Sequence, residues 1–154
     1  MIAIIIPSFD NWDSLQKTIQ SIRESNYNKY KIVIIDSSVN NEIQNSISAC
    51  NVDIHYVRTA PEVWWSEAIN IGYESVSNEI ELDYLLLLNS DVIVSNDLLC
   101  ELVDLSLKLE NSIIGPQIFD INNLKVPWNL GGEIKWPYPG EYHLNDVKEL
   151  NNLK

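Results

Sequence analysis

A short apolar run that breaks off into polar residues most constrains what this chain can fold into. Residues 84–88 carry no charge and no turn former, and Asn89, Ser90 and Asp91 follow at once. Such a run predicts a strand buried on both faces, as in parallel sheets covered by helices. Ligands of open α/β sheets bind just outside the carboxyl ends of the strands. Asp91 is therefore expected beside a ligand, although Asn89 and Asp91 are equally ordinary turn residues.

Further apolar runs predict more strands, with helical segments between them. Residues 2–6 and 31–36 predict two buried strands, and residues 53–58 predict a strand nearer an edge. Apolar residues at helical spacing predict a helix capped by Asn11 or Asp13 and bearing Leu15, Ile19 and Ile22 on one stripe. Further helices are predicted at about 42–50, 64–76 and 96–110.

The remaining segments complete the expected topology. Residues 113–119 predict a strand, 120–123 a turn, and 125–136 a strand pair around Gly131 and Gly132. The alternation of strands and helices predicts a doubly wound α/β sheet. Right-handed crossovers then bring the carboxyl ends of the strands to one side, so Asp36 and Asp91 are expected to face the same crevice.

Composition narrows the class of partner. The chain has 154 residues, of which 45% are hydrophobic, and a net charge of -12. This charge argues against nucleic acid or an anionic membrane surface as a general partner. It also means that a phosphate group needs a cation or backbone N–H groups to bind. Two scattered cysteines and no apolar run of membrane-spanning length predict a protein of the reducing cytoplasm.

Carboxylates at strand ends invite two interpretations. A flavodoxin-like receiver or phosphatase domain needs an acid directly after the first strand and a lysine at the end of a later one. Here the first strand ends in Pro7 and Ser8, and no lysine stands at the later position. The second interpretation is a nucleotide-sugar site, and several motifs favour it.

The motifs resemble those of GT-A fold glycosyltransferases of family 2, in particular bacterial rhamnosyltransferase-like members. Residues 4–11 (IIIPSFDN) look like the family's opening V-I-P-T-Y-N, and residues 33–38 (VIIDSS) look like its V-V-D-[DN]-x-S. Residues 64–72 (WWSEAINIG) are similar to G-x-x-x-A-x-N-x-G, and residues 86–92 (LLLNSDV) to L-L-N-[PS]-D-[TV]. The resemblance implies a Rossmann-like nucleotide-diphospho-sugar transferase fold, with a mostly parallel sheet flanked by helices.

The resemblance also implies roles for individual residues. Asp91 would bind Mn²⁺ or Mg²⁺, which stabilises the charge on a leaving diphosphate. Asp36 would read the base: a carboxylate only accepts hydrogen bonds, which suits uracil, thymine or guanine and disfavours cytosine. The alternative is that Asp36 is only a turn residue. The other residues implied to bind the nucleotide sugar are Pro7, Ser8, Phe9, Trp65, Asn70, Asn89 and Ser90.

Several of these positions have a competing structural explanation. Phe9 is equally suited to the core, and of the adjacent Trp64 and Trp65 we expect one to face the donor and the other the core. Ile69 replaces the family's usual arginine, which leaves Arg58 as the nearest cation for phosphate. A solvated charge at the end of a strand is the simpler explanation for Arg58.

The expected general base has no clear counterpart. Inverting transfer needs a carboxylate that takes a proton from the acceptor hydroxyl. Glu133 and Glu141 are weak candidates, and neither matches the family's pattern. We therefore expect a C-terminally truncated fold, with a donor-binding domain over residues 1–138 and a tail over 139–154. Its partners would be UDP, dTDP or GDP sugars and a glycan or lipid-linked acceptor, with inverting transfer serving bacterial surface polysaccharide synthesis. The alternative is a non-catalytic donor-binding or assembly module, with homodimerisation covering an apolar edge and peripheral membrane association through partners.

Overall fold

The chain divides into two compact units. The structure is a computed structural model that describes residues 1–49, 53–78, 81–109, 112–129, 132–134 and 141–143. The first unit spans Met1–Glu101 and the second Leu102–Lys154. None of the described helices is long and apolar enough to cross a membrane.

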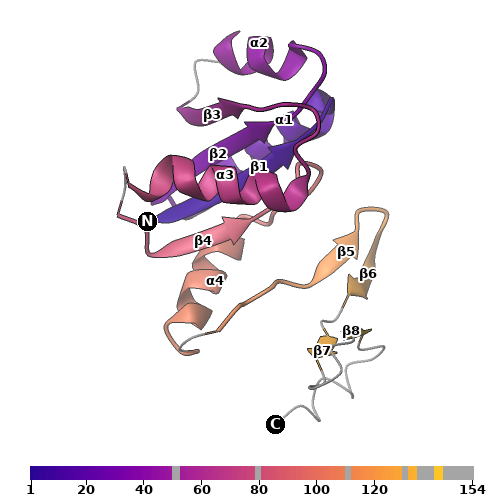
Figure 1. The fold of residues 1–154 in the computed structure, drawn as a ribbon. Helices are drawn as coiled ribbons and strands as arrows, with labels where there is room; N and C mark the ends of the chain where they lie inside the picture. Colours follow the sequence, from indigo (N-terminus) through magenta and orange to yellow (C-terminus); the bar gives the residue numbers. More distant parts are fainter. Residues whose placement is uncertain (50–52, 79–80, 110–111, 130–131, 135–140, 144–154) are drawn as a thin grey trace. The chain divides into compact units, whose positions relative to one another are not determined.

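The first unit is built on a four-stranded parallel sheet flanked by helices, as predicted (Figure 1). Its strands lie in the order β3-β2-β1-β4. The strands are β1 (Ile2–Ser8), β2 (Tyr30–Asp36), β3 (Ile54–Arg58) and β4 (Tyr84–Leu87). The helices are α1 (Trp12–Arg23), α2 (Glu42–Ala49), α3 (Trp65–Ser77) and α4 (Leu98–Ser106), the last of which runs across the boundary between the units.

Both faces of the sheet's centre are covered. On one face Ala3, Ile5, Val33 and Ile35 pack against Ala68, Ile69 and Val76 of α3. Figure 1 shows α1 on the opposite side of the sheet from α3, and its predicted apolar stripe is buried. Gly72 lets α3 approach closely, because a Cβ built there would lie 2.6 Å from Ile5 Cγ2. Burial of β1 and β2 on both faces explains their uninterrupted apolar sequences.

The prediction that the run 84–88 is buried on both faces is wrong. Leu85 and Leu87 are 43% and 41% exposed. They pair with Ala3 and Ile5, so they lie on the α3 face, but β4 is the edge strand and α3 packs mainly over β1 and β2. An apolar run alone does not distinguish an edge strand from a central one.

The second unit holds two small antiparallel sheets. β5 (Ile118–Asp120) pairs with β6 (Asn123–Asn129) across the predicted turn, and β7 (Gly132–Ile134) pairs with β8 (Glu141–His143). The predicted strand at 113–119 therefore begins only at Ile118. The predicted pair within 125–136 is also wrong, because each half has another partner. A two-residue turn closes β5 onto β6, with the Asn122 N–H donating to Asp120 Oδ1 at 2.7 Å, and such local closure costs little entropy. Gly131 and Trp136 lie outside the described residues.

Candidate functional site

The carboxyl ends of three neighbouring strands meet at one edge of the sheet. Ser8 at the end of β1 is the register partner of Asp36 at the end of β2. β4 runs parallel on the other side of β1, and the Leu88 N–H donates to the Ile5 carbonyl at 3.1 Å. Asn89, Ser90 and Asp91 therefore emerge at the same edge as Asp36, as the topology predicted.

A hydrogen-bonded chain fixes the loop after β4 to the end of β1. Ser8 Oγ donates to Asn11 Oδ1, and Asn11 Nδ2 donates to Ser90 Oγ, each at a distance of 2.6 Å. Thr18 Oγ1 of α1 donates to the Ser90 carbonyl at 3.0 Å. Ser8 and Ser90, predicted to bind the donor, are thus buried and joined to each other through Asn11.

Sequence reasoning missed this role of Asn11. Asn11 occupies the N-cap position of α1, but its side chain makes no cap hydrogen bond, because its amide bridges the two serines instead. A signal was present in the sequence. Thr18 and Ser21 lie among the apolar positions of α1, and both are buried. Ser21 Oγ accepts the Val94 N–H at 3.1 Å, so two polar residues on an otherwise apolar helix face mark where the loop after β4 is anchored.

The loop after β4 also carries the exposed polar groups of the site. Asp91 is exposed, and Asn89 Oδ1 accepts the Trp65 Nε1–H at 3.1 Å. Within the residues that the structure describes, no group of three or more Asp, Glu, His or Cys side chains could hold a metal ion. Asp91 is thus a solvent-facing carboxylate at this edge of the sheet.

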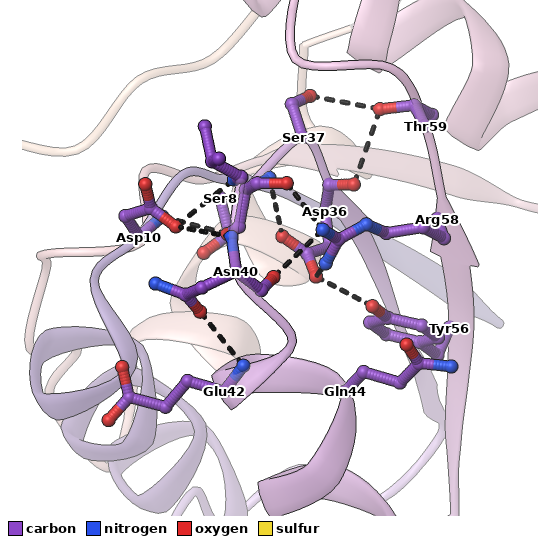
Figure 2. A network of polar contacts seen from close by, with 12 residues as sticks. Ser8, Asp10, Asp36, Ser37, Asn40, Glu42, Gln44, Tyr56, Arg58 and Thr59 are labelled. Atoms are coloured by element: carbon purple, nitrogen blue, oxygen red, sulfur yellow. Dashed lines mark hydrogen bonds and ion pairs between the residues drawn. The ribbon is translucent and has the colours of Figure 1, made fainter.

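Asp36 is the most deeply buried charge at this edge (Figure 2). Its side chain is 0% exposed, and Oδ2 accepts both the Tyr56 hydroxyl and Arg58 Nη1 at 2.6 Å. Oδ1 accepts the Ser38 N–H at 2.9 Å. The pKa of Tyr56 is raised to about 12, mainly by burial of the hydroxyl and secondly by its hydrogen bond to Asp36. The phenol therefore stays protonated and remains a donor to Asp36 at neutral pH.

Arg58 is neither a solvated charge nor a cation left over for phosphate. Nη1 forms an ion pair with Asp36. Nη2 donates to the carbonyl of Ser38 and also to the carbonyl of Asn40, the latter at 2.8 Å. The planar fork of a guanidinium allows several acceptors to be held at once. Arg58 thus ties the loop after β2 to the buried carboxylate.

The loops after β1 and β2 are tied together as well. Asp10 adopts a left-handed conformation (φ 46°), and its Oδ1 accepts the N–H groups of Val39 and Asn40 at 3.2 and 3.4 Å. The Asp10 N–H donates to Ser38 Oγ at 2.8 Å. Pro7 is half-buried beside this junction, and Phe9 is 53% exposed. The alternative that Phe9 is a core residue is therefore wrong, which leaves its ring free to contact a ligand.

The two tryptophans both lie outside the core. Trp64 is 81% and Trp65 47% exposed, so the expectation that one of them packs inside is wrong. Val63, just before them, packs partly buried against the core cluster that includes Ala68 and Ile69. Asn70 is exposed in α3.

The two weak candidates for the general base belong to the second unit. Glu133 lies in β7 opposite Tyr142, and Glu141 lies in β8 opposite Ile134. Their catalytic role stays a prediction.

Known structures share this fold. S. aureus TarS 1-349 matches with a TM-score of 0.55 at 13% identity over 75% of this chain and 38% of that one. TarS 1-349 in complex with UDP-GlcNAc gives 0.54 at 12% identity, over 77% and 38%. The mannosyltransferase PcManGT from Pyrobaculum calidifontis, in complex with GDP-Man and Mn²⁺, gives 0.54 at 13% identity, over 68% and 32%. The chain thus spans less than half the length of these glycosyltransferases, and no curated protein sequence matches it.

The family is shown by sequence. The model of the family described as "Glycosyl transferase family 2" matches residues 3–153, nearly the whole chain. The match takes in the strand ends at which Ser8, Asp36 and Asp91 lie, and the four-stranded parallel sheet agrees with the GT-A fold of the structural neighbours. The chain belongs to glycosyl transferase family 2.

Proposed function

We propose that this chain binds a nucleoside-diphosphate sugar at the sheet edge, as the donor site of a glycosyltransferase. The observation that carries the proposal is the pair of carboxylates on either side of β1: Asp36 is buried and fixed, and Asp91 is exposed. A fixed acceptor suits recognition of a base, whereas an exposed carboxylate suits a hydrated cation. Neighbours of this fold are known in complex with UDP-GlcNAc and with GDP-Man and Mn²⁺. UDP and GDP sugars are therefore proposed donors, together with dTDP sugars, because thymine carries the same N3–H as uracil.

A divalent metal fits the residues that are present. Mg²⁺ typically binds proteins through one or two carboxylates and completes its shell with water and phosphate oxygens. Asp91 supplies one carboxylate, and Asn89 is held beside it by Trp65. When bound, the metal would supply Lewis acidity to the leaving diphosphate. The net charge of -12 favours such a cation for holding a diphosphate here.

The remaining parts of the site follow from this placement. Phe9 offers an exposed ring beside the loops that bury Asp36, and Trp65 and Asn70 lie on α3, whose first turn contacts Asn89. We assign Pro7 and Phe9 to the base, and Trp65 and Asn70 to the donor's sugar and diphosphate. Ser8 and Ser90 hold the site together through Asn11.

Transfer would be inverting, with a carboxylate taking the proton from the acceptor hydroxyl as it attacks the sugar. Glu133 and Glu141 are the candidate bases. The acceptor would be a glycan or a lipid-linked glycan of a bacterial surface polysaccharide, handled on the cytoplasmic side with peripheral membrane contact through partners.

Calorimetry tests the donor site. We expect UDP, dTDP or GDP to bind in the presence of Mn²⁺, and Asp91→Ala to weaken that binding at least about tenfold. Asp53→Ala is the matched control, because Asp53 is also exposed but directly precedes β3, at the amino ends of the strands and away from the site. If none of the three nucleotides binds the wild-type chain with Mn²⁺, the proposal is wrong.

A non-catalytic donor-binding or assembly module is the second candidate. The exposed apolar side chains of Leu85 and Leu87 on the edge strand favour it, since such a surface suits a partner. Turnover of a bound donor to free sugar would identify an enzyme. Donor binding without turnover, together with a dimer in light scattering that Leu85→Lys converts to a monomer, would identify the module.

A further inference from the structure

The buried carboxylate of Asp36 has little acceptor capacity to spare. An ionised carboxylate offers about four lone-pair positions, two on each oxygen. Tyr56 and Arg58 together occupy Oδ2, and the Ser38 N–H occupies one position on Oδ1. One acceptor position therefore remains, and it is on Oδ1.

The groups that cover Asp36 are held by the same arginine. Asp36 is fully buried, whereas Val39 and Asn40 in the loop after β2 are exposed. Arg58 donates to carbonyls of that loop, at Ser38 and Asn40, and to Asp36 itself (Figure 2). Its own side chain is partly exposed at the surface of the site. Arg58 thus connects the loop of residues 38–40, which covers Asp36, to the buried carboxylate itself.

We propose that Arg58 and Tyr56 are specificity-determining positioning residues, which make Asp36 select bases that carry a ring N–H. This inference rests on the proposed donor site. Uracil and thymine carry an N3–H and guanine an N1–H, which a fixed, ionised oxygen can accept. Cytosine presents a lone pair at N3, which the same oxygen repels.

The two residues act by different means. Arg58 holds Oδ2 of Asp36 and, through the carbonyls of Ser38 and Asn40, the loop that covers the carboxylate, so it fixes the acceptor and its surroundings together. Tyr56 fixes the orientation of Oδ2 and with it that of Oδ1. Because Asp36 is fully buried, a base would reach Oδ1 only once the covering loop of Val39 and Asn40 moves aside. Neither residue needs to touch the donor.

The test is a ratio of affinities, because a merely structural role would leave the ratio unchanged. Calorimetry with Mn²⁺ would compare CDP with whichever of UDP, dTDP and GDP binds best. We expect the wild-type chain to prefer the N–H-bearing base by at least about tenfold, and Arg58→Met to reduce that preference by about tenfold. Tyr56→Phe keeps the ring, loses only the donor, and should reduce the preference by about threefold to fivefold.

Matched variants separate the possible failures. Arg23→Met makes the same chemical change at the exposed end of α1 and should leave the ratio unaltered. If Arg58→Met does not fold by circular dichroism, Arg58→Lys takes its place, since one ammonium cannot hold the carboxylate and both carbonyls.

An unaltered ratio in folded Arg58 and Tyr56 variants overturns this inference while leaving the donor site intact, and so does a wild-type chain that binds CDP equally well. Absence of binding by any nucleotide overturns the proposed function itself.

Discussion

Close packing of α3 on β1 can be tested with a single methyl group. Gly72→Ala places a Cβ 2.6 Å from Ile5 Cγ2 and 3.2 Å from Ile35 Cγ1, both in the buried core. Carbon atoms in contact normally lie about 3.5–4.0 Å apart. Because the branched Ile5 side chain is enclosed on all sides, α3 must move away from the sheet by several tenths of an ångström or more.

The size of the effect follows from two opposing terms. Overpacking a well-packed core costs about 1–3 kcal/mol, while replacing glycine by alanine within a helix gains about 0.5–1 kcal/mol. Because 2.6 Å is a severe overlap, the upper part of the first range applies, and we expect Gly72→Ala to lower the free energy of unfolding by about 1–2.5 kcal/mol. Urea titration followed by circular dichroism would measure this as a lower midpoint with an unchanged slope.

Gly115→Ala is the matched control for this experiment. A Cβ built at Gly115 meets nothing within 4 Å, so alanine there should leave stability unchanged or raise it slightly through the unfolded chain. A Gly72→Ala variant as stable as wild type would refute the argument that α3 packs this closely on Ile5. So would an equal loss of stability at both glycines.

The remaining predictions concern the polar network. Asn11→Ala removes the shared partner of two buried hydroxyls, Ser8 and Ser90, and should lower the free energy of unfolding by about 1–3 kcal/mol; an unchanged urea midpoint would contradict the bridge. The pKa of Tyr56 is raised from 10.0 to about 12, so its contribution to stability is complete below pH 10 and is lost as the pH rises from 10 to 12. Urea titrations at pH 8 and pH 11 should therefore show a larger loss for wild type than for Tyr56→Phe, and equal losses would contradict the raised pKa.

Local sequence patterns predicted the elements of the first unit because their periods are set by local geometry. The β-branched run 2–6 and the stripe of Leu15, Ile19 and Ile22 each fit only one kind of element, and the structure confirms both. The order of elements then predicted the edge at which Asp36 and Asp91 lie. Parallel strands with right-handed crossovers leave few alternatives.

What sequence reasoning missed depends on partners far apart in the chain. The bridge from Asn11 to Ser90 spans 79 positions, and the contact of Arg58 with Asp36 spans 22. Asn and Arg side chains have many possible partners, and no local period selects among them. The same reason explains the exposure of Leu85 and Leu87, since an edge position is a property of the whole sheet.

The anchoring of Ser90 has a consequence for how the protein folds. β4 pairs with β1 only after a chain segment of roughly 75 residues has closed, and contacts at such separation form slowly. The loop carrying Asn89, Ser90 and Asp91 acquires its shape at that moment, when Asn11 and Thr18 meet Ser90. In a refolding experiment, competence to bind a nucleotide with Mn²⁺ should therefore arise in the last kinetic phase, after the helical signal has recovered.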